Sequence, residues 1–351
     1  MNKSLTVCPF CPLHCDDIVL DSQNLTNGQC EIADKHFAAA QVGSVQVGSV
    51  QVGSVQVGSV QVGSVQVGSV QARIGDQAAS RADVEAIRDQ LIAKADKTTV
   101  AVSATSLSQS RWLAGLLRDG RIELTVDQTP TMAAMRSTIA RDGNISATLG
   151  DVKKHADVVW AIGSPETEMP RIWERLECEP VSDATVGANE LADRIFAVRN
   201  NSTSIGPDAQ SIASAKYLAI VIGSSAFLPG EEIATAELLV KWVIDRNRET
   251  KSGSQRAVLL AIDPAATLRS VVGWQTNERL KPTSGPVDLR IGDANSATYP
   301  AKLQIGGIDP GTELAESYVV APIPGIDFDD AVIRGDGTVT LPLEAVGKQQ
   351  R

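Results

Sequence analysis

The sequence predicts an α/β protein with parallel β-sheets and an N-terminal cysteine-rich cap. From residue 98 onward, short apolar runs alternate with longer amphipathic segments, which is the pattern of βαβ units. The run 157–163 (D-V-V-W-A-I-G) is almost wholly apolar, as expected of a parallel strand that is buried on both faces. Four of the five cysteines fall within the first 30 residues, so the cap is distinct from the body that follows.

The elements follow from local patterns. Glu31 to Ala40 reads as a helix, and Ser80 with Asp83 resembles a capping box at the start of the next one. Apolar runs rich in β-branched residues predict strands, and apolar positions at helical spacing predict helices. Strands are expected at 98–103, 121–126, 157–163, 194–198, 217–223 and 257–262, and further helices at 109–117, 132–140, 148–156 and 231–245. Short strands with Gly/Pro turns are expected from 287, ending at 338–346.

These patterns divide the chain into four parts. Residues 1–40 are a cysteine-rich segment of iron–sulfur type, and 41–71 are an insertion built on six unchanged Q-V-G-S-V units. A period of five turns each valine to the opposite face of a strand and leaves no steady apolar face on a helix. We therefore expect the insertion to be disordered and without function. Residues 72–265 form a Rossmann-like α/β body, and 266–351 form a C-terminal α/β region with short strands.

Composition excludes several classes of function. The 351 residues carry a formal net charge of −10, which disfavours a nucleic-acid partner because phosphates would be repelled. The aromatic content of 4% also argues against a platform for stacking bases. No apolar run approaches the roughly 18 residues that span a bilayer, so a cytoplasmic protein is expected. Only His14, His36 and His155 are present, too few for a binuclear metallohydrolase.

The candidate metal ligands are Cys8, Cys11, Cys15 and Cys30, spaced C-x2-C-x3-C-x14-C. Three close cysteines and one remote cysteine are typical of a single iron–sulfur cluster. A zinc site and a vestigial site that has lost its metal remain open alternatives. Disulfides are not expected, because nothing at the N-terminus reads as a signal peptide.

The sequence indicates no catalytic residue. Gly163 and Gly223 follow buried strands, but neither turn is a G-x-G-x-x-G or Walker loop, and turn geometry explains a glycine there. Cys178 stands alone in a charged stretch without a nearby histidine to activate it.

Several motifs together resemble the B subunit of formylmethanofuran dehydrogenase, a branch of the molybdopterin oxidoreductases. They are V-C-P-F-C-P-L-H-C-D-D-I with N-G-Q-C-E-I-A-D, V-D-Q-T-P-T-M-A (126–133), T-L-G-D-V-K-K-H-A-D-V-V (148–159), L-A-E-S-Y-V-V-A-P-I-P-G and R-G-D-G (334–337). The resemblance implies doubly wound parallel sheets of the molybdopterin oxidoreductase type. It also implies that Cys8, Cys11, Cys15 and Cys30 hold a 4Fe–4S cluster.

The chain departs from this family at the metal. Redox-active members place a cysteine ligand to tungsten or molybdenum just after a V-D-N-T-like stretch, where this chain has Ala133. A tungsto- or molybdopterin is therefore not expected. The chain is similar to the bacterial version of the B subunit, found in the formyltransferase/hydrolase complex of tetrahydromethanopterin-linked one-carbon metabolism. The resemblance implies a non-redox structural subunit that supports formate release, partnered by the other subunits. The alternative is a redox-active tungsten- or molybdenum-pterin dehydrogenase subunit.

Overall fold

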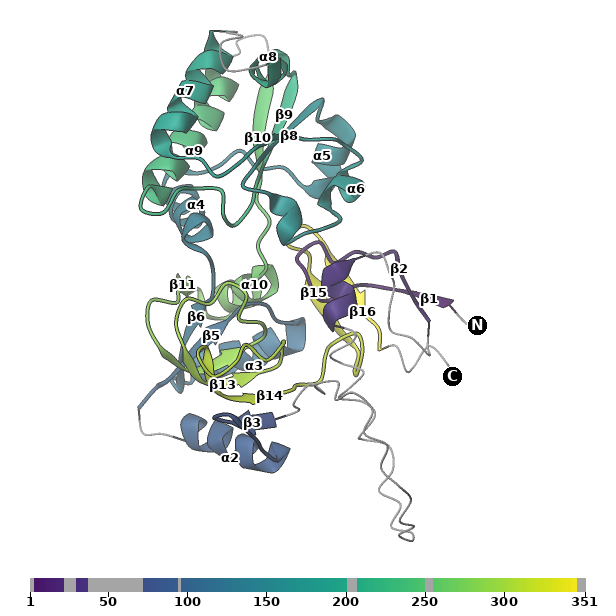
Figure 1. The fold of residues 1–351 in the computed structure, drawn as a ribbon, viewed down its shortest axis with the longest axis vertical. Helices are drawn as coiled ribbons and strands as arrows, with labels where there is room; N and C mark the ends of the chain where they lie inside the picture. Colours follow the sequence, from purple (N-terminus) through teal and green to yellow (C-terminus); the bar gives the residue numbers. More distant parts are fainter. Residues whose placement is uncertain are drawn as a thin grey trace.

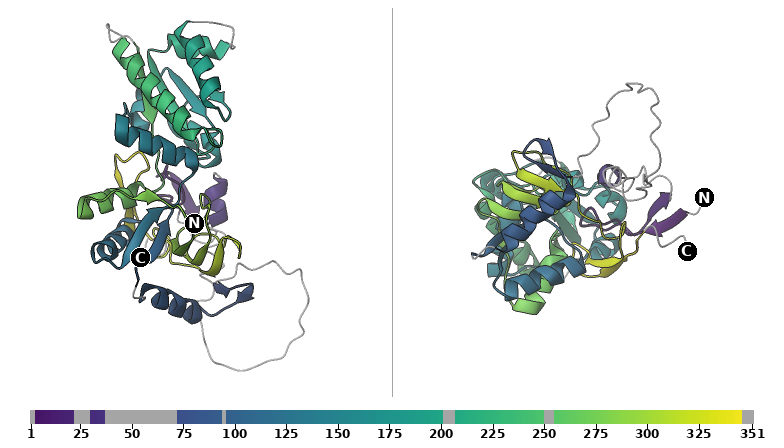
Figure 2. Two further views of the ribbon diagram at one scale, coloured as in Figure 1. Left: turned by 90° about the vertical axis from the view of Figure 1, so that its left-hand side faces the viewer. Right: turned by 90° about the horizontal axis from the view of Figure 1, so that it is seen from below.

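The computed structural model describes residues 3–21, 30–36, 72–93, 96–200, 207–249 and 255–345. Within these residues the strands form one four-stranded sheet, one eight-stranded sheet and two two-stranded hairpins. The two larger sheets lie in two lobes stacked along the long axis, and the cysteine segment and the C-terminal hairpin lie beside their junction (Figures 1 and 2). The 41–71 insertion, with its expected disorder, falls outside the described residues.

The four-strand lobe is built from residues 130–262. Its strands are all parallel and run in the order β10-β9-β7-β8. They are β7 (Val158–Ile162), β8 (Val181–Asp183), β9 (Tyr217–Ile222) and β10 (Arg256–Leu260). The helices are α4 (Pro130–Asp142), α5 (Leu149–His155), α6 (Ile172–Leu176), α7 (Ala188–Arg199), α8 (Pro207–Ser214) and α9 (Glu232–Glu249).

Side-chain alternation along these strands gives the sheet two apolar faces. Trp160 and Ile162 belong to the core formed with α4, α7, α8 and α9, where Trp160 meets Trp242 edge to face at 5.7 Å between ring centroids. Val159 and Val258 belong to the opposite core, which contains α5, α6 and the cysteine segment. The cysteine segment is therefore packed on one face of this sheet.

The eight-strand lobe holds strands from both ends of the chain, in the order β11-β6-β5-β12-β13-β14-β3-β4. Pairing is parallel from β11 to β14 and antiparallel for β3 and β4. The strands are β3 (Ala72–Ile74), β4 (Gln77–Ala78), β5 (Thr98–Val102), β6 (Ile122–Val126), β11 (Lys281–Pro282), β12 (Val287–Ile291), β13 (Ala301–Ile305) and β14 (Ala315–Val319). The helices are α2 (Arg81–Ile92), α3 (Leu107–Arg118) and α10 (Ala266–Thr276).

Strand order reverses between β5 and β12, because the chain leaves β5 toward β6 and leaves β12 toward β13. Strands of the expected 72–265 body and of the expected 266–351 region thus share one sheet. Such a reversal opens a crevice at the carboxyl ends of the strands, which is where ligands bind in parallel sheets.

Most predicted elements are confirmed to within a few residues, including the cap at Ser80, whose side chain accepts a hydrogen bond from the backbone N–H of Asp83. The strand predicted at 194–198 is wrong, because these residues are helical and belong to α7. Leu191, Ile195 and Val198 are all buried at helical spacing, so the apolar run is the inner stripe of a helix. The sequence patterns also did not reveal α10 and β8.

The turn role expected for two glycines is confirmed. Gly163 has a φ of 76°, and a Cβ there would lie 2.3 Å from the Cα of Ala226. A Cβ on Gly223 would lie 2.2 Å from the carbonyl oxygen of Gly163. Neither position admits a side chain.

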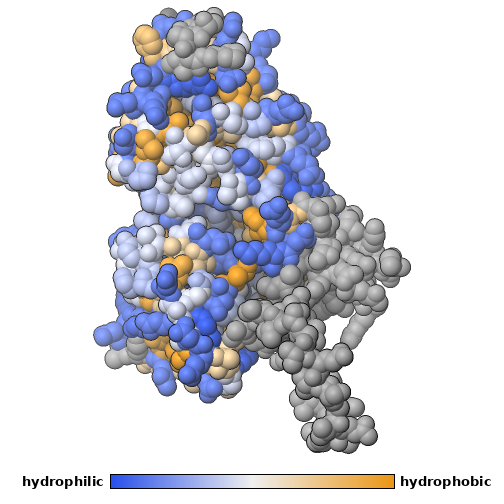
Figure 3. Space-filling model, viewed as in Figure 1, coloured by the Kyte–Doolittle hydropathy of each residue, from blue (hydrophilic) through white to orange (hydrophobic). Residues whose placement is uncertain are grey.

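Two hairpins lie beside the lobe junction (Figure 1). The N-terminal one pairs β1 (Lys3–Thr6) with β2 (Ile18–Asp21), and the C-terminal one pairs β15 (Asp330–Ile333) with β16 (Thr340–Leu343). On the face seen in Figure 3, apolar residues are scattered in small patches among polar ones. No helix in the described part of the chain is long and apolar enough to cross a bilayer.

Candidate metal centre and interlobe cleft

The four candidate ligands lie in the interior. Cys8, Cys11 and Cys15 belong to the loop between β1 and β2, and Cys30 directly precedes the helical residues 31–36. The exposed fractions are 3% for Cys8 and Cys15 and 8% for Cys11 and Cys30. The cysteines are thiols rather than disulfides. The backbone N–H of Cys8 donates to the carbonyl of Cys15 over 2.9 Å and closes the loop at its base.

The four thiols lie within electrostatic range of one another. Burial, followed by repulsion from Cys11, Cys15 and Cys30, raises the pKa of Cys8 well above its ordinary value. Burial, with repulsion from Cys15 and Cys30, raises the pKa of Cys11 to about 12. Without a bound cation the thiols of Cys8 and Cys11 are protonated at neutral pH, so a metal must displace their protons to bind.

The thiols are not drawn together around a single ion. Among the described residues, no three His, Cys, Asp or Glu side chains are placed to hold one metal ion. A tetrahedral zinc site with Zn–S bonds of about 2.3 Å needs sulfurs about 3.8 Å apart. A four-iron cluster is larger and accepts more widely spaced thiolates.

Two arginines from α6 and the residue before it provide positive charge beside Cys15. Arg171, only 5% exposed, donates to both oxygens of Asp17 over 2.9 and 2.7 Å, and Arg175 donates to Asp16 over 2.6 Å. Burial raises the pKa of Cys15, and the charges of Arg171 and Arg175 oppose that rise. These contacts tie the cysteine loop to α6 and favour a thiolate at Cys15.

His14 has a structural role in the loop. It adopts a left-handed conformation with φ of 44°, and its ring Nδ1 lies 3.0 Å from the carbonyl oxygen of Cys8. Burial lowers the pKa of His14 to about 4, so the ring is neutral at pH 7.

The C-terminal hairpin turn holds the cysteine loop against both lobes. Gly335 donates its N–H to the carbonyl of Pro12 over 2.8 Å and accepts from the N–H of Asp263 over 2.9 Å. Asp336, in the same turn, accepts from the N–H of Leu149 at the start of α5 over 3.1 Å. The R-G-D-G motif therefore joins the cysteine loop, the four-strand lobe and the chain leading into α10.

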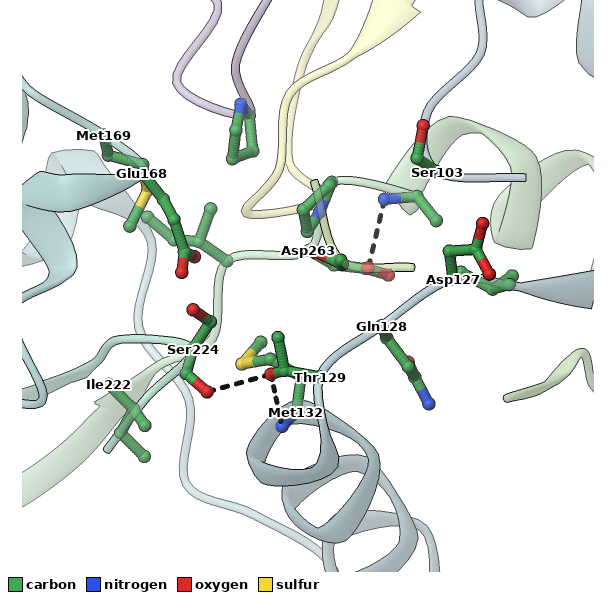
Figure 4. Close-up of a pocket in the computed structure, with 16 residues that line it drawn as sticks. Ser103, Asp127, Gln128, Thr129, Met132, Glu168, Met169, Ile222, Ser224 and Asp263 are labelled. Carbon is green, nitrogen blue, oxygen red and sulfur yellow. Dashed lines mark hydrogen bonds between the residues drawn. The ribbon is translucent and has the colours of Figure 1, made fainter. Parts of the chain in front are cut away.

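The residue before the position expected for the family's metal ligand is Met132, which faces a narrow cleft between the lobes (Figure 4). Met132 lines this cleft, and the N–H of Ala133 is bonded to the carbonyl of Thr129. The cleft holds about 30 Å³. The Thr129 hydroxyl crosses it and donates to the Ser224 carbonyl over 2.9 Å.

Ion pairs close the cleft on one side. The carboxylate of Asp263 pairs with Arg136 of α4 at 2.9 Å and with Arg269 of α10 at 3.1 Å. The helices α4 and α10 belong to different lobes, so Asp263 ties the lobes together.

A cavity of about 520 Å³, which the sequence did not reveal, lies at the strand-order reversal of the eight-strand lobe. It lies between the cysteine segment and the carboxyl ends of β5, β12, β13 and β14. The signal was present in I-G-D (291–293) and I-G-G (305–307), where glycines with φ of 91°, 78° and 69° end apolar strands. Spacing alone did not reveal that these two turns are adjacent.

Taken together, the fold and the buried cysteine loop define a mixed α/β protein with parallel sheets and an N-terminal cysteine-bearing segment. No protein-family model and no curated protein sequence matches the chain. In fold the chain is similar to a chain of the formyltransferase/hydrolase complex from Methylorubrum extorquens, solved with methylofuran. That similarity has a TM-score of 0.53 at 17% sequence identity and covers 78% of this chain and 93% of the other.

Proposed function

We propose that this chain is a cytoplasmic, non-redox structural subunit, equivalent to the B subunit, of a formyltransferase/hydrolase complex in one-carbon metabolism. The fold similarity to a chain of such a complex supports this proposal. The observation that carries its non-redox part is Ala133, which stands where redox-active members have a cysteine ligand and follows Met132 in the wall of the interlobe cleft. Its partners would be the subunits that transfer and hydrolyse the formyl group.

Cys8, Cys11, Cys15 and Cys30 would hold a 4Fe–4S cluster in this subunit. All four are buried, they influence one another electrostatically, and the charges of Arg171 and Arg175 oppose the rise that burial causes in the pKa of Cys15. Such a cluster can store an electron, but here its role would be to cross-link the loop to the helical residues 31–36, since metal sites of this kind stabilise small segments.

We infer that a tungsto- or molybdopterin is not held beside Met132. The cleft that Met132 lines holds about 30 Å³, whereas cofactor pockets commonly measure several hundred Å³. Ala133 offers no lone pair for a metal, and the thioether of Met132 is a weak donor.

Assays of the purified complex test this function. It should release formate from its formylated cofactor and should not reduce a viologen dye with formate or formylmethanofuran. Metal analysis of the same sample should find iron but no stoichiometric tungsten or molybdenum. Dye reduction together with stoichiometric tungsten or molybdenum would establish the redox-active alternative and reject the structural role.

A further inference from the structure

We propose that the 520 Å³ cavity of the eight-strand lobe binds a small amphipathic amine, whose protonated amino group pairs with Asp293 and whose flat apolar body contacts the cavity wall. The inference goes beyond the structural role proposed above. The cavity shares Ser103 and Pro264 with the interlobe cleft, and residues of the cysteine loop cover it.

The cavity has the size and position of a ligand site. Small-molecule sites commonly measure about 300–1,000 Å³ and lie where strand order reverses in a parallel sheet. Four strands end at this cavity, and the cysteine segment covers it with Pro9, Phe10, His14 and His36. Residues from distant parts of the chain thus form a single enclosure.

The wall is suited to a flat apolar group. Phe10 and His36 stack with ring centroids 4.6 Å apart and an interplanar angle of 10°. The buried ring of Tyr318 and the side chains of Ile291 and Ile305 line the same cavity. Aromatic faces also attract cations, so this wall favours a ligand that carries positive charge near an apolar body.

The charge in the cavity is acidic. Among the described residues that line it there is no lysine or arginine, whereas Asp293 and Asp309 are present. Arg73 binds Asp309 through contacts of 2.8 to 3.1 Å and balances that charge. No arginine or lysine among the described residues that line the cavity balances the charge of Asp293.

Asp293 has an oxygen available for a ligand. Its Oδ1 accepts from the N–H of Ile308 over 2.8 Å, and its Oδ2 lies 3.4 Å from Nε2 of His36, which is longer than a good hydrogen bond. Burial lowers the pKa of His36 and outweighs the opposing effect of the Asp293 charge, with Lys35 acting in the same direction as burial. The side chain of Asp293 is 24% exposed.

The carboxylate of Asp330 occupies the N-terminus of α3, where a phosphate would otherwise bind. In parallel α/β folds the helix after the first strand commonly directs its N-terminal N–H groups at a phosphate. Here the helix is α3, and the carboxylate of Asp330 accepts from the N–H of Ser108 over 3.2 Å and from the Ser108 hydroxyl. Gln109 accepts from the N–H of Ser106 over 3.0 Å. A phosphate-bearing ligand is disfavoured because the carboxylate of Asp330 already occupies the N-terminus of α3.

Isothermal titration of the full chain with a matched set of probes tests the proposal. Tryptamine, tryptophol and indole-3-acetate share one ring and differ in carrying an ammonium, an alcohol or a carboxylate. We expect tryptamine to bind at least roughly tenfold more tightly than tryptophol, since a charge-assisted contact contributes that much. Indole-3-acetate and inorganic pyrophosphate should bind more weakly still.

Two variants and one control locate the site. Asp293→Asn keeps an acceptor for the Ile308 N–H. In this variant the affinity for tryptamine should fall to that for tryptophol. Ala321→Phe should fill the rim and weaken both probes together. Asp119→Asn, on the exposed C-terminal end of α3, should leave all affinities unchanged. Equal affinity for amine and alcohol, tighter binding of carboxylate or pyrophosphate, no binding of any probe, or unchanged tryptamine binding in Asp293→Asn would each overturn the proposal.

Discussion

Gly335 touches Pro12 so closely that no side chain fits between them. A Cβ on Gly335 would lie 2.6 Å from the Cβ of Pro12, 2.8 Å from its carbonyl oxygen and 2.7 Å from the Ile262 side chain. The C-terminal turn therefore meets the cysteine loop by direct backbone contact, which explains why the R-G-D-G motif carries glycine at this position.

Gly335→Ala should push the C-terminal turn away from the cysteine loop. Overpacking of this kind costs about 1–3 kcal/mol, so the free energy of unfolding should fall by that amount in urea titrations. Gly115→Ala is a matched control, because nothing lies within 4 Å of a Cβ there. Alanine within helix α3 should stabilise by about 0.5–1 kcal/mol. Equal stability of Gly335→Ala and wild type would contradict the contact.

The cysteine loop should contain iron and sulfide. Anaerobically purified protein should be brown and hold iron and acid-labile sulfide in equal amounts. Cys11→Ser should lose the colour and speed hydrogen exchange in residues 6–18, because folding of the loop is linked to the metal. Cys178→Ser is the control and should change neither property. Colourless protein with one zinc per chain would favour zinc instead.

Arg171→Met should loosen the attachment of the cysteine loop to α6. The side chain of Arg171 is 6% exposed and pairs with Asp17 and Glu174, which are 41% and 61% exposed and can be hydrated when it is lost. The free energy of unfolding should fall on the order of 1–2 kcal/mol, with faster hydrogen exchange near Asp17. Arg141→Met removes exposed ion pairs to Asp142 and Glu237 and should hardly change stability. Similar effects of both variants would disprove a special role for Arg171.

Asp336 should make the C-terminal turn sensitive to acid. Its side chain is fully buried, which would raise its pKa, but hydrogen bonds from Arg334, Thr338 and the Leu149 N–H outweigh burial and lower the pKa. A carboxyl with a depressed folded-state pKa stabilises the fold above its unfolded pKa of about 3.9 and loses that contribution as pH falls further. In urea titrations, the free energy of unfolding should fall less between pH 7 and pH 3 for Asp336→Asn than for wild type. Parallel curves would refute this role.

Deleting five of the six Q-V-G-S-V units should leave folding and complex assembly intact and reduce aggregation. The alternating Val/Ser pattern offers no continuous apolar surface to bury, and it resembles segments that form cross-β aggregates. Size-exclusion chromatography and co-purification with partner subunits measure this outcome. Loss of either property would show that the repeat is structural.

The local periods of the sequence determined most elements of this fold. The apolar run 157–163 became β7, and the caps at Ser80 and Thr148 start helices, because these features depend on neighbours within a few residues. The strand predicted at 194–198 was wrong because the local pattern is ambiguous. Five apolar-rich residues fit a strand or one face of a helix equally well, and packing against α9 decided between them.

The tertiary structure alone decided what surrounds the candidate sites. The spacing of Cys8, Cys11 and Cys15 could be recognised in the sequence. Their packing against α5 and α6 could not, nor could the contact between Pro12 and Gly335, which are far apart in the sequence. The return of β12 to the side of β5 likewise placed Asp293 and Phe10 around one cavity. Sheet pairing over long chain separations is set by the summed burial of whole faces, and no spacing within a single segment records it.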